Sequence, residues 1–140
     1  MRGVRRRRPK PRSKCTSSPN AWPVAHCALR RRGAARQLIA LFLALIAGVY
    51  CGALLAQSVP GHFVALELAI AGAVFACAVV GLRASTPYLA AGYVLHGAWG
   101  LLHYPNAVPT RVSRWFPPMC AAFDFVVAVA LLIGPWRPMA

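Results

Sequence analysis

Four long apolar runs, separated by short connections, constrain this chain more than any other feature. The runs span residues 38–56, 63–82, 86–104 and 115–134. A helix of roughly 20 apolar residues crosses a hydrocarbon core about 30 Å thick, so each run is predicted to be a transmembrane helix. Short connections force consecutive helices to run antiparallel. The predicted fold is therefore an all-α, polytopic membrane protein built as a four-helix transmembrane bundle.

The composition agrees with this fold class, because 59% of the residues are hydrophobic and only 13% are charged. The net charge of +14 is concentrated at one end, since all but four of the sixteen Lys and Arg residues precede Leu38. That segment is also rich in Pro and Ser and has no apolar periodicity. We expect residues 1–36 to be a disordered basic cytoplasmic tail, residues 37–136 to form the transmembrane domain, and residues 137–140 to be a short C-terminal end.

Arginines near the ends of the runs predict the orientation, because positive flanks stay in the cytoplasm. Arg36, Arg83 and Arg137 fall on one side of the predicted bundle, which makes both termini cytoplasmic. A cleaved signal peptide is the rival interpretation of the first run, but Leu54 would stand where a small residue is needed. An organelle transit peptide is a further alternative for the tail. Contact with anionic lipid headgroups is favoured, and no specific nucleic-acid partner is expected.

Small residues recur every four positions in the first run, at Ala44, Gly48, Gly52 and Ala56. Such a stripe lets another helix approach closely. We expect it to pack against a helix of the same chain, with a homo-oligomer as the alternative.

The only two carboxylates in the chain, Glu67 and Asp124, both lie inside apolar runs. An ionisable residue at membrane depth costs roughly 3 kcal/mol on insertion scales, so it marks a functional site by default. Helix phase and depth place His96 beside Asp124 near the midplane and His103 beside Glu67 nearer the surface. We therefore predict two His–carboxylate pairs facing one cavity, with these four residues as catalytic candidates. The same pairs could instead hold helices together.

Five further residues are candidates for binding a substrate in that cavity. Trp99 lies between the two histidines, Cys120 lies one turn from Asp124, and Trp115 suits the membrane interface. Arg111 and Arg114 are predicted on the outer side, where they could attract an anionic group. No metal site is predicted, because His96 and His103 are about 10 Å apart along a helix axis. A metal would need one of these histidines together with Glu67 and Asp124, and the sequence leaves the cofactor unknown.

The residues from Glu67 to Asp124 resemble a family of small bacterial four-helix membrane proteins of unknown function. The resemblance is carried by Glu67, by the Gly92-Tyr93 pair, by His96-x-x-Trp99 followed by His103, and by Trp115-x-Pro117 with Cys120-x-x-x-Asp124. It implies a protein of the bacterial inner membrane and brings no established activity. The family pattern has an Asp after the Trp, where this chain has Gly100, which puts any inherited catalytic role in doubt.

Three classes of function fit these observations. The first is a protein that binds or acts on a lipid-like or other hydrophobic small molecule through the His and carboxylate groups. The second is a structural or accessory membrane subunit. The third is a small proton-coupled carrier that uses the same groups as a relay, which would need a dimer because the chain lacks paired repeat halves.

Overall fold

The computed structural model describes residues 22–104 and 107–134, and every regular element in these ranges is a helix. The helices are α1 (Trp22–Ala47), α2 (Val49–Leu55), α3 (Gly61–Arg83), α4 (Thr86–Leu102) and α5 (Phe116–Ile133). α1 and α2 together take the place of the first predicted helix, and α3, α4 and α5 match the other three. The all-α four-helix prediction is confirmed.

The first helix differs from the prediction at its start and near its middle. It begins at Trp22 rather than near Leu38, so residues 22–36 are helical although they were expected to be disordered. Pro23 is tolerated in a first turn, and the Ala, Leu and Arg residues that follow have high helix propensity. The helix is interrupted at Gly48, after which α2 begins. The expectations for residues 1–21 and 137–140 lie outside the described residues.

The helices are long and apolar enough for a membrane protein. Three segments, Gly33–Leu55, Gly61–Arg83 and Phe116–Ile133, could each cross a bilayer by length and composition. α4 has 17 residues, which is the lower end of the range that spans a hydrocarbon core. Large apolar side chains face outward on all of them, among them Leu45, Phe75 and Leu132. The chain thus exposes its apolar side chains and buries its carboxylates, as expected of a protein whose solvent is lipid.

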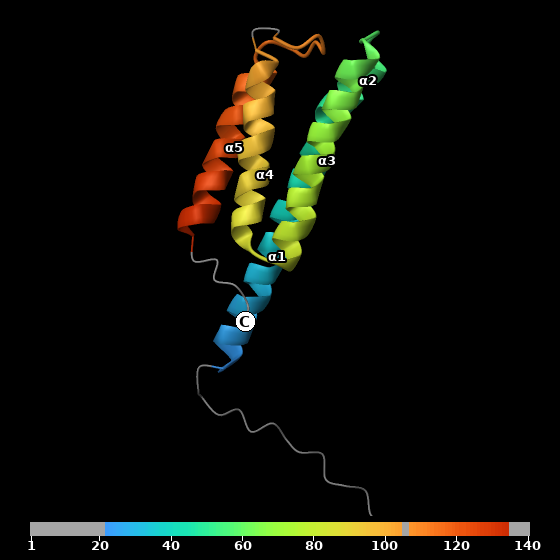
Figure 1. The fold of residues 1–140 in the computed structure, drawn as a ribbon. Coiled ribbons are helices and arrows are strands. Elements are labelled where there is room, and N and C mark those ends of the chain that lie inside the picture. Colours follow the sequence, from blue (N-terminus) through green and yellow to red (C-terminus); the bar gives the residue numbers. More distant parts are fainter. Residues whose placement is uncertain (1–21, 105–106, 135–140) are drawn as a thin grey trace, which may run out of the picture.

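The helix at the centre of the fold is α4. It packs against α5, α3 and α1, whereas α5 packs chiefly against α4 (Figure 1). Buried glycines allow these close approaches: a Cβ added at Gly92 would lie 2.6 Å from Leu43 of α1, and one at Gly97 would lie 3.1 Å from Asp124 of α5. Side chains of all four long helices complete an apolar core, which includes Leu43, Val74, Leu89, Tyr93 and Leu131.

Three of the four small residues on the first helix, Gly48, Gly52 and Ala56, are exposed, whereas Ala44 is partly buried against the core. A Cβ added at Gly52 would meet no atom within 4 Å, and one at Gly48 would meet only the Leu45 carbonyl of its own helix. The expectation of intrachain packing is therefore wrong for these glycines. Phase explains the error, because the neighbouring Ala47, Tyr50 and Leu54 face the interior instead.

The two ends of the bundle differ. At one end, Arg36 of α1 donates hydrogen bonds to the Gly81 carbonyl in the last turn of α3, one of them at 3.1 Å from Nε. This contact places a positive charge at a helix C-terminus, where free carbonyls favour cations. The opposite end gathers α2, the start of α3, the end of α4 and the segment that leads into α5 (Figure 1). Three buried polar residues, Glu67, His103 and Thr110, lie toward this second end, whereas the buried Thr86 lies at the start of α4, near the end of α3.

Candidate functional site

The most heavily hydrogen-bonded side chain of the site is Glu67, on the second turn of α3. It is 3% exposed. Its Oε2 accepts a hydrogen bond from Trp99 Nε1 at 2.7 Å, and its Oε1 accepts one from Thr110 Oγ1 at 2.9 Å. The same Oε1 shares a hydrogen bond with His103 Nε2 at 2.9 Å. One buried carboxylate therefore joins α3 to α4 and to the segment before α5.

The segment before α5 is held in place by Gln57, which follows α2. The Gln57 amide donates to the Arg111 carbonyl and accepts from the Arg111 backbone amide, each at 2.8 Å. This pair of bonds fixes the backbone next to Thr110, whose side chain is buried. Thr110 and Arg111, which precede α5, thus belong to the site.

The pair of His96 with Asp124 joins α4 to α5. It lies on the interior side of the pair of His103 with Glu67. His96 Nδ1 and Asp124 Oδ2 are 2.7 Å apart, and the two residues are 3% and 1% exposed. His96 Nε2 lies 3.0 Å from the Ile46 carbonyl in the last turn of α1. Because α1 ends at Ala47, this carbonyl belongs to a turn whose acceptors need outside donors. Both predicted pairings, His96 with Asp124 and His103 with Glu67, are confirmed as contacts.

The two histidines are held in the same way, and this arrangement fixes the number of protons in each pair. His103 Nδ1 lies 3.1 Å from the Trp99 carbonyl, and His96 Nε2 lies 3.0 Å from the Ile46 carbonyl. A carbonyl can only accept, so in each ring the nitrogen facing it carries a hydrogen. One further proton must lie between the other ring nitrogen and the carboxylate. Whichever atom holds that proton, each pair has no net charge.

Tyr50 of α2 lies between the two pairs, although the sequence pattern gave it no role. Its ring stacks on His103 with centroids 4.0 Å apart and lies 5.7 Å from that of His96. The residue is 2% exposed. Within the described residues its hydroxyl is buried without a hydrogen-bond partner, an arrangement that costs about 1–3 kcal/mol.

The Tyr50 hydroxyl occupies space left by a glycine. A Cβ added at Gly100 would lie 2.8 Å from the hydroxyl oxygen and 3.8 Å from the ring carbon that carries it. Gly100 follows His96 by four residues and precedes His103 by three, so all three share one face of α4. The hydroxyl therefore lies over the middle of the face that presents both histidines.

The five predicted substrate-binding residues fall in different environments. Trp99 is part of the site through its bond to Glu67. Cys120 is half-buried, on the turn of α5 before Asp124. Arg111, Arg114 and Trp115 are exposed, and only the backbone of Arg111 is tied to the site.

Sequence reasoning missed Tyr50, Gln57 and the role of Thr110. Tyr50 is the one hydroxyl-bearing side chain in the apolar part of the first helix, which was a signal that could have been used.

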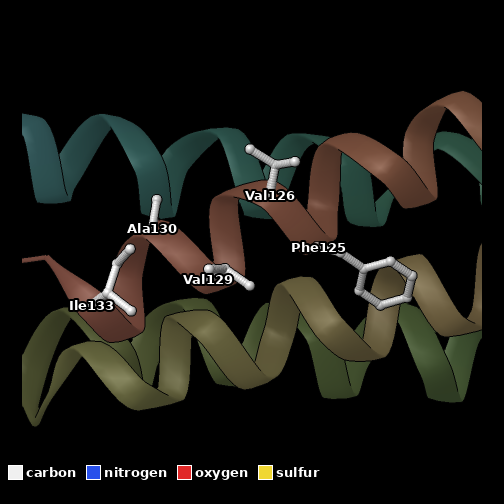
Figure 2. A pocket seen from close by; sticks show the side chains of 5 residues that line it. All are labelled: Phe125, Val126, Val129, Ala130 and Ile133. Carbon is white, nitrogen blue, oxygen red and sulfur yellow. The ribbon is translucent and has the colours of Figure 1, made fainter.

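An apolar hollow of about 430 Å³ lies on α5, away from the hydrogen-bonded groups. It is lined by Phe125, Val126, Val129, Ala130 and Ile133, and Figure 2 shows these side chains along one stretch of the helix. None of the four predicted catalytic residues lines it. The predicted arrangement, four polar groups facing an open cavity, therefore does not describe this hollow. The four groups are instead bonded to one another and to backbone carbonyls.

The fold and the site define a polytopic helical membrane protein with buried polar groups beside its apolar core. The chain belongs to the family of unknown function DUF6010, which matches residues 21–136. This match confirms the resemblance to a family of small helical proteins without an assigned activity. No curated protein and no solved structure is significantly similar to the chain.

Proposed function

We propose that this protein takes up and releases protons at its two buried His–carboxylate pairs, as a small proton-coupled carrier of the bacterial cell membrane. The observation that carries the proposal is that in each pair one ring nitrogen lies within hydrogen-bond distance of the carboxylate and the other within that distance of a backbone carbonyl. This arrangement leaves one proton to be shared between the ring and the acid. Moving that proton is a small chemical change. The electrostatic effect of adding a proton to the pair or removing one is large, because the neutral pair then becomes charged in a low-dielectric interior.

A charge that appears at membrane depth needs compensation. A pair that gains a proton becomes positive and attracts an anion, whereas a pair that loses one becomes negative and attracts a cation. Arg111 and Arg114 are exposed in the segment before α5 that also supplies Thr110 to Glu67, which supports uptake of an anionic group together with a proton. Trp99, Trp115 and Cys120 are retained as candidates for contact with that group.

Proton flux into liposomes tests this proposal. The purified protein is reconstituted with a pH-sensitive dye inside the vesicles, and a pH gradient is applied with potassium and valinomycin to balance charge. We expect flux above that of protein-free vesicles, and we expect Asp124→Asn and Glu67→Gln to abolish it. His62→Gln is the matched control, because His62 is exposed at the start of α3 and should leave flux unchanged.

The same experiment distinguishes proton transfer from a structural role. If the wild-type protein carries no protons, or if both carboxylate variants carry them at the wild-type rate while losing stability, the pairs serve only to hold helices together. That result would support the structural or accessory subunit.

A second candidate function, binding of a lipid-like or other hydrophobic molecule, is favoured by the hollow on α5. Its lining is entirely apolar, and its Phe125 side chain lies next to Gly97 on α4 and follows Asp124 in sequence. Native mass spectrometry from mild detergent tests this function. A retained lipid-like molecule should be lost in Ala130→Phe, which fills the hollow, and kept in Ala122→Phe, which adds the same bulk at an exposed position outside it.

The arginine flanks support an orientation with both termini in the cytoplasm. Fusions of alkaline phosphatase and a fluorescent protein to the C-terminus test it. Fluorescence without phosphatase activity is expected, and the reverse pattern would refute this orientation.

A further inference from the structure

We propose that the Tyr50 hydroxyl joins the two His–carboxylate pairs into one proton path along the inner face of α4. This inference rests on the proposed function, because a path matters only if the pairs exchange protons. The path adds a residue from α2 and connects the two pairs.

The distance between the two histidines requires an intermediate group. His96 and His103 are separated by about 10 Å along the helix axis, which is too far for a direct proton transfer. The Tyr50 hydroxyl lies over Gly100, whose backbone is about 6 Å along the helix axis from that of His96 and about 4.5 Å from that of His103. One bridging water reaches across an interval of about that length.

The Tyr50 hydroxyl can both donate and accept a proton, as such a path needs. It is buried and has no partner within the described residues, so both its donor and its acceptor capacity remain available. Two other buried hydroxyls are already committed: Tyr93 donates to the Ile39 carbonyl, and Thr110 donates to Glu67. Glu67, Asp124 and Cys120 all lie near enough to act on the Tyr50 hydroxyl electrostatically.

The Tyr50 ring is held in place by its contact with His103. Tyr50 is stacked on His103 at 4.0 Å with an interplanar angle of 16°, which limits motion of the ring. Rotation about the C–O bond remains free, because the hydroxyl proton is fixed by no acceptor. The oxygen is thus held in place while its proton can turn toward either pair.

The transfer leaves the tyrosine unchanged. A proton arrives at the Tyr50 oxygen from the Glu67–His103 side while the hydroxyl's own proton leaves toward the His96–Asp124 side. One O–H bond forms and one breaks, so the phenol is restored and no charge stays on it. The reverse direction follows the same steps.

A double variant at Tyr50 and Gly100 removes the hydroxyl and fills the space that the hydroxyl occupied. In Tyr50→Phe with Gly100→Ala, the new methyl group would lie 3.8 Å from the ring carbon, an ordinary contact, so packing is preserved while the hydroxyl is lost. Tyr88→Phe is the matched control, because Tyr88 lies on α4 and is 49% exposed. Two quantities are measured in each protein: proton flux in liposomes, and protonation of the two carboxyl groups by infrared spectroscopy.

We expect the flux of the double variant to fall about a hundredfold, the lower end of the contribution of a positioned proton-transfer group, with carboxyl protonation retained. Wild-type flux in the double variant would overturn the path and leave the proposed function intact. Loss of both flux and carboxyl protonation would also overturn it, because Tyr50 would then be needed for binding protons rather than for passing them. Absence of flux in the wild-type protein would overturn the proposed function itself, and the path with it.

Discussion

Substitution of Gly100 by alanine gives a quantitative test of how the site is packed. The added methyl group would lie 2.8 Å from the Tyr50 hydroxyl, closer than carbon and oxygen approach without a bond, while its other neighbours lie at 3.8 Å. Overpacking of a close-packed interior costs about 1–3 kcal/mol. Gly100→Ala should therefore lower the free energy of unfolding by about that amount.

The same geometry predicts how this loss can be recovered. Tyr50→Phe alone removes a buried hydroxyl that has no partner within the described residues, so it should raise the free energy of unfolding by about 1–3 kcal/mol. In the double variant the clash is gone, and the effect of Gly100→Ala should largely disappear. The two substitutions are therefore coupled by about 1–3 kcal/mol.

Reversible unfolding in mixed micelles, followed by tryptophan fluorescence, measures these free energies. Gly72→Ala serves as the control, because a Cβ there would meet no atom within 4 Å and stability should not fall. If Gly100→Ala destabilises the protein equally with Tyr50 and with Phe at position 50, the hydroxyl does not occupy the space above Gly100 and the reasoning fails.

Three further predictions concern other parts of the structure. Glu67→Ala should cost more unfolding free energy than Asp124→Ala, by roughly 1–3 kcal/mol, because Glu67 has three side-chain partners and Asp124 has one; equal costs in the micelle assay would contradict this. Arg36→Ala should cost about 1–2 kcal/mol through the lost contact with the end of α3, and the exposed Gln37→Ala should cost nothing measurable. Gly52→Ala should leave stability within about 0.5 kcal/mol, and a changed mass by light scattering would reveal a second copy on that face.

The helices and the two pairs could be predicted from the sequence for simple physical reasons. Apolar length set the bounds of the second to fourth helices to within two residues at most ends, because a membrane span has a fixed thickness. The pairing of His96 with Asp124 and of His103 with Glu67 followed from depth, since only groups at the same level of adjacent antiparallel helices can meet.

The features that escaped prediction depend on rotation about a helix axis and on irregular backbone. Tyr50 faces the interior and Gly52 faces outward because of the phase of the first helix, in which one residue changes direction by about 100°. The interruption at Gly48 and the bonds between Gln57 and Arg111 involve backbone groups, which leave no pattern in the sequence. These features supply the Ile46 carbonyl and Thr110 to the site.

Infrared titration of the carboxyl groups tests the central claim most directly. Glu67 and Asp124 are the only side-chain carboxyls in the chain, so each signal can be assigned with Glu67→Gln and Asp124→Asn. If the pairs exchange protons, both signals should change reversibly with pH in the folded, membrane-embedded protein, and each variant should remove one of them. Signals that stay constant until the protein unfolds would contradict the claim and leave the pairs with a purely structural role.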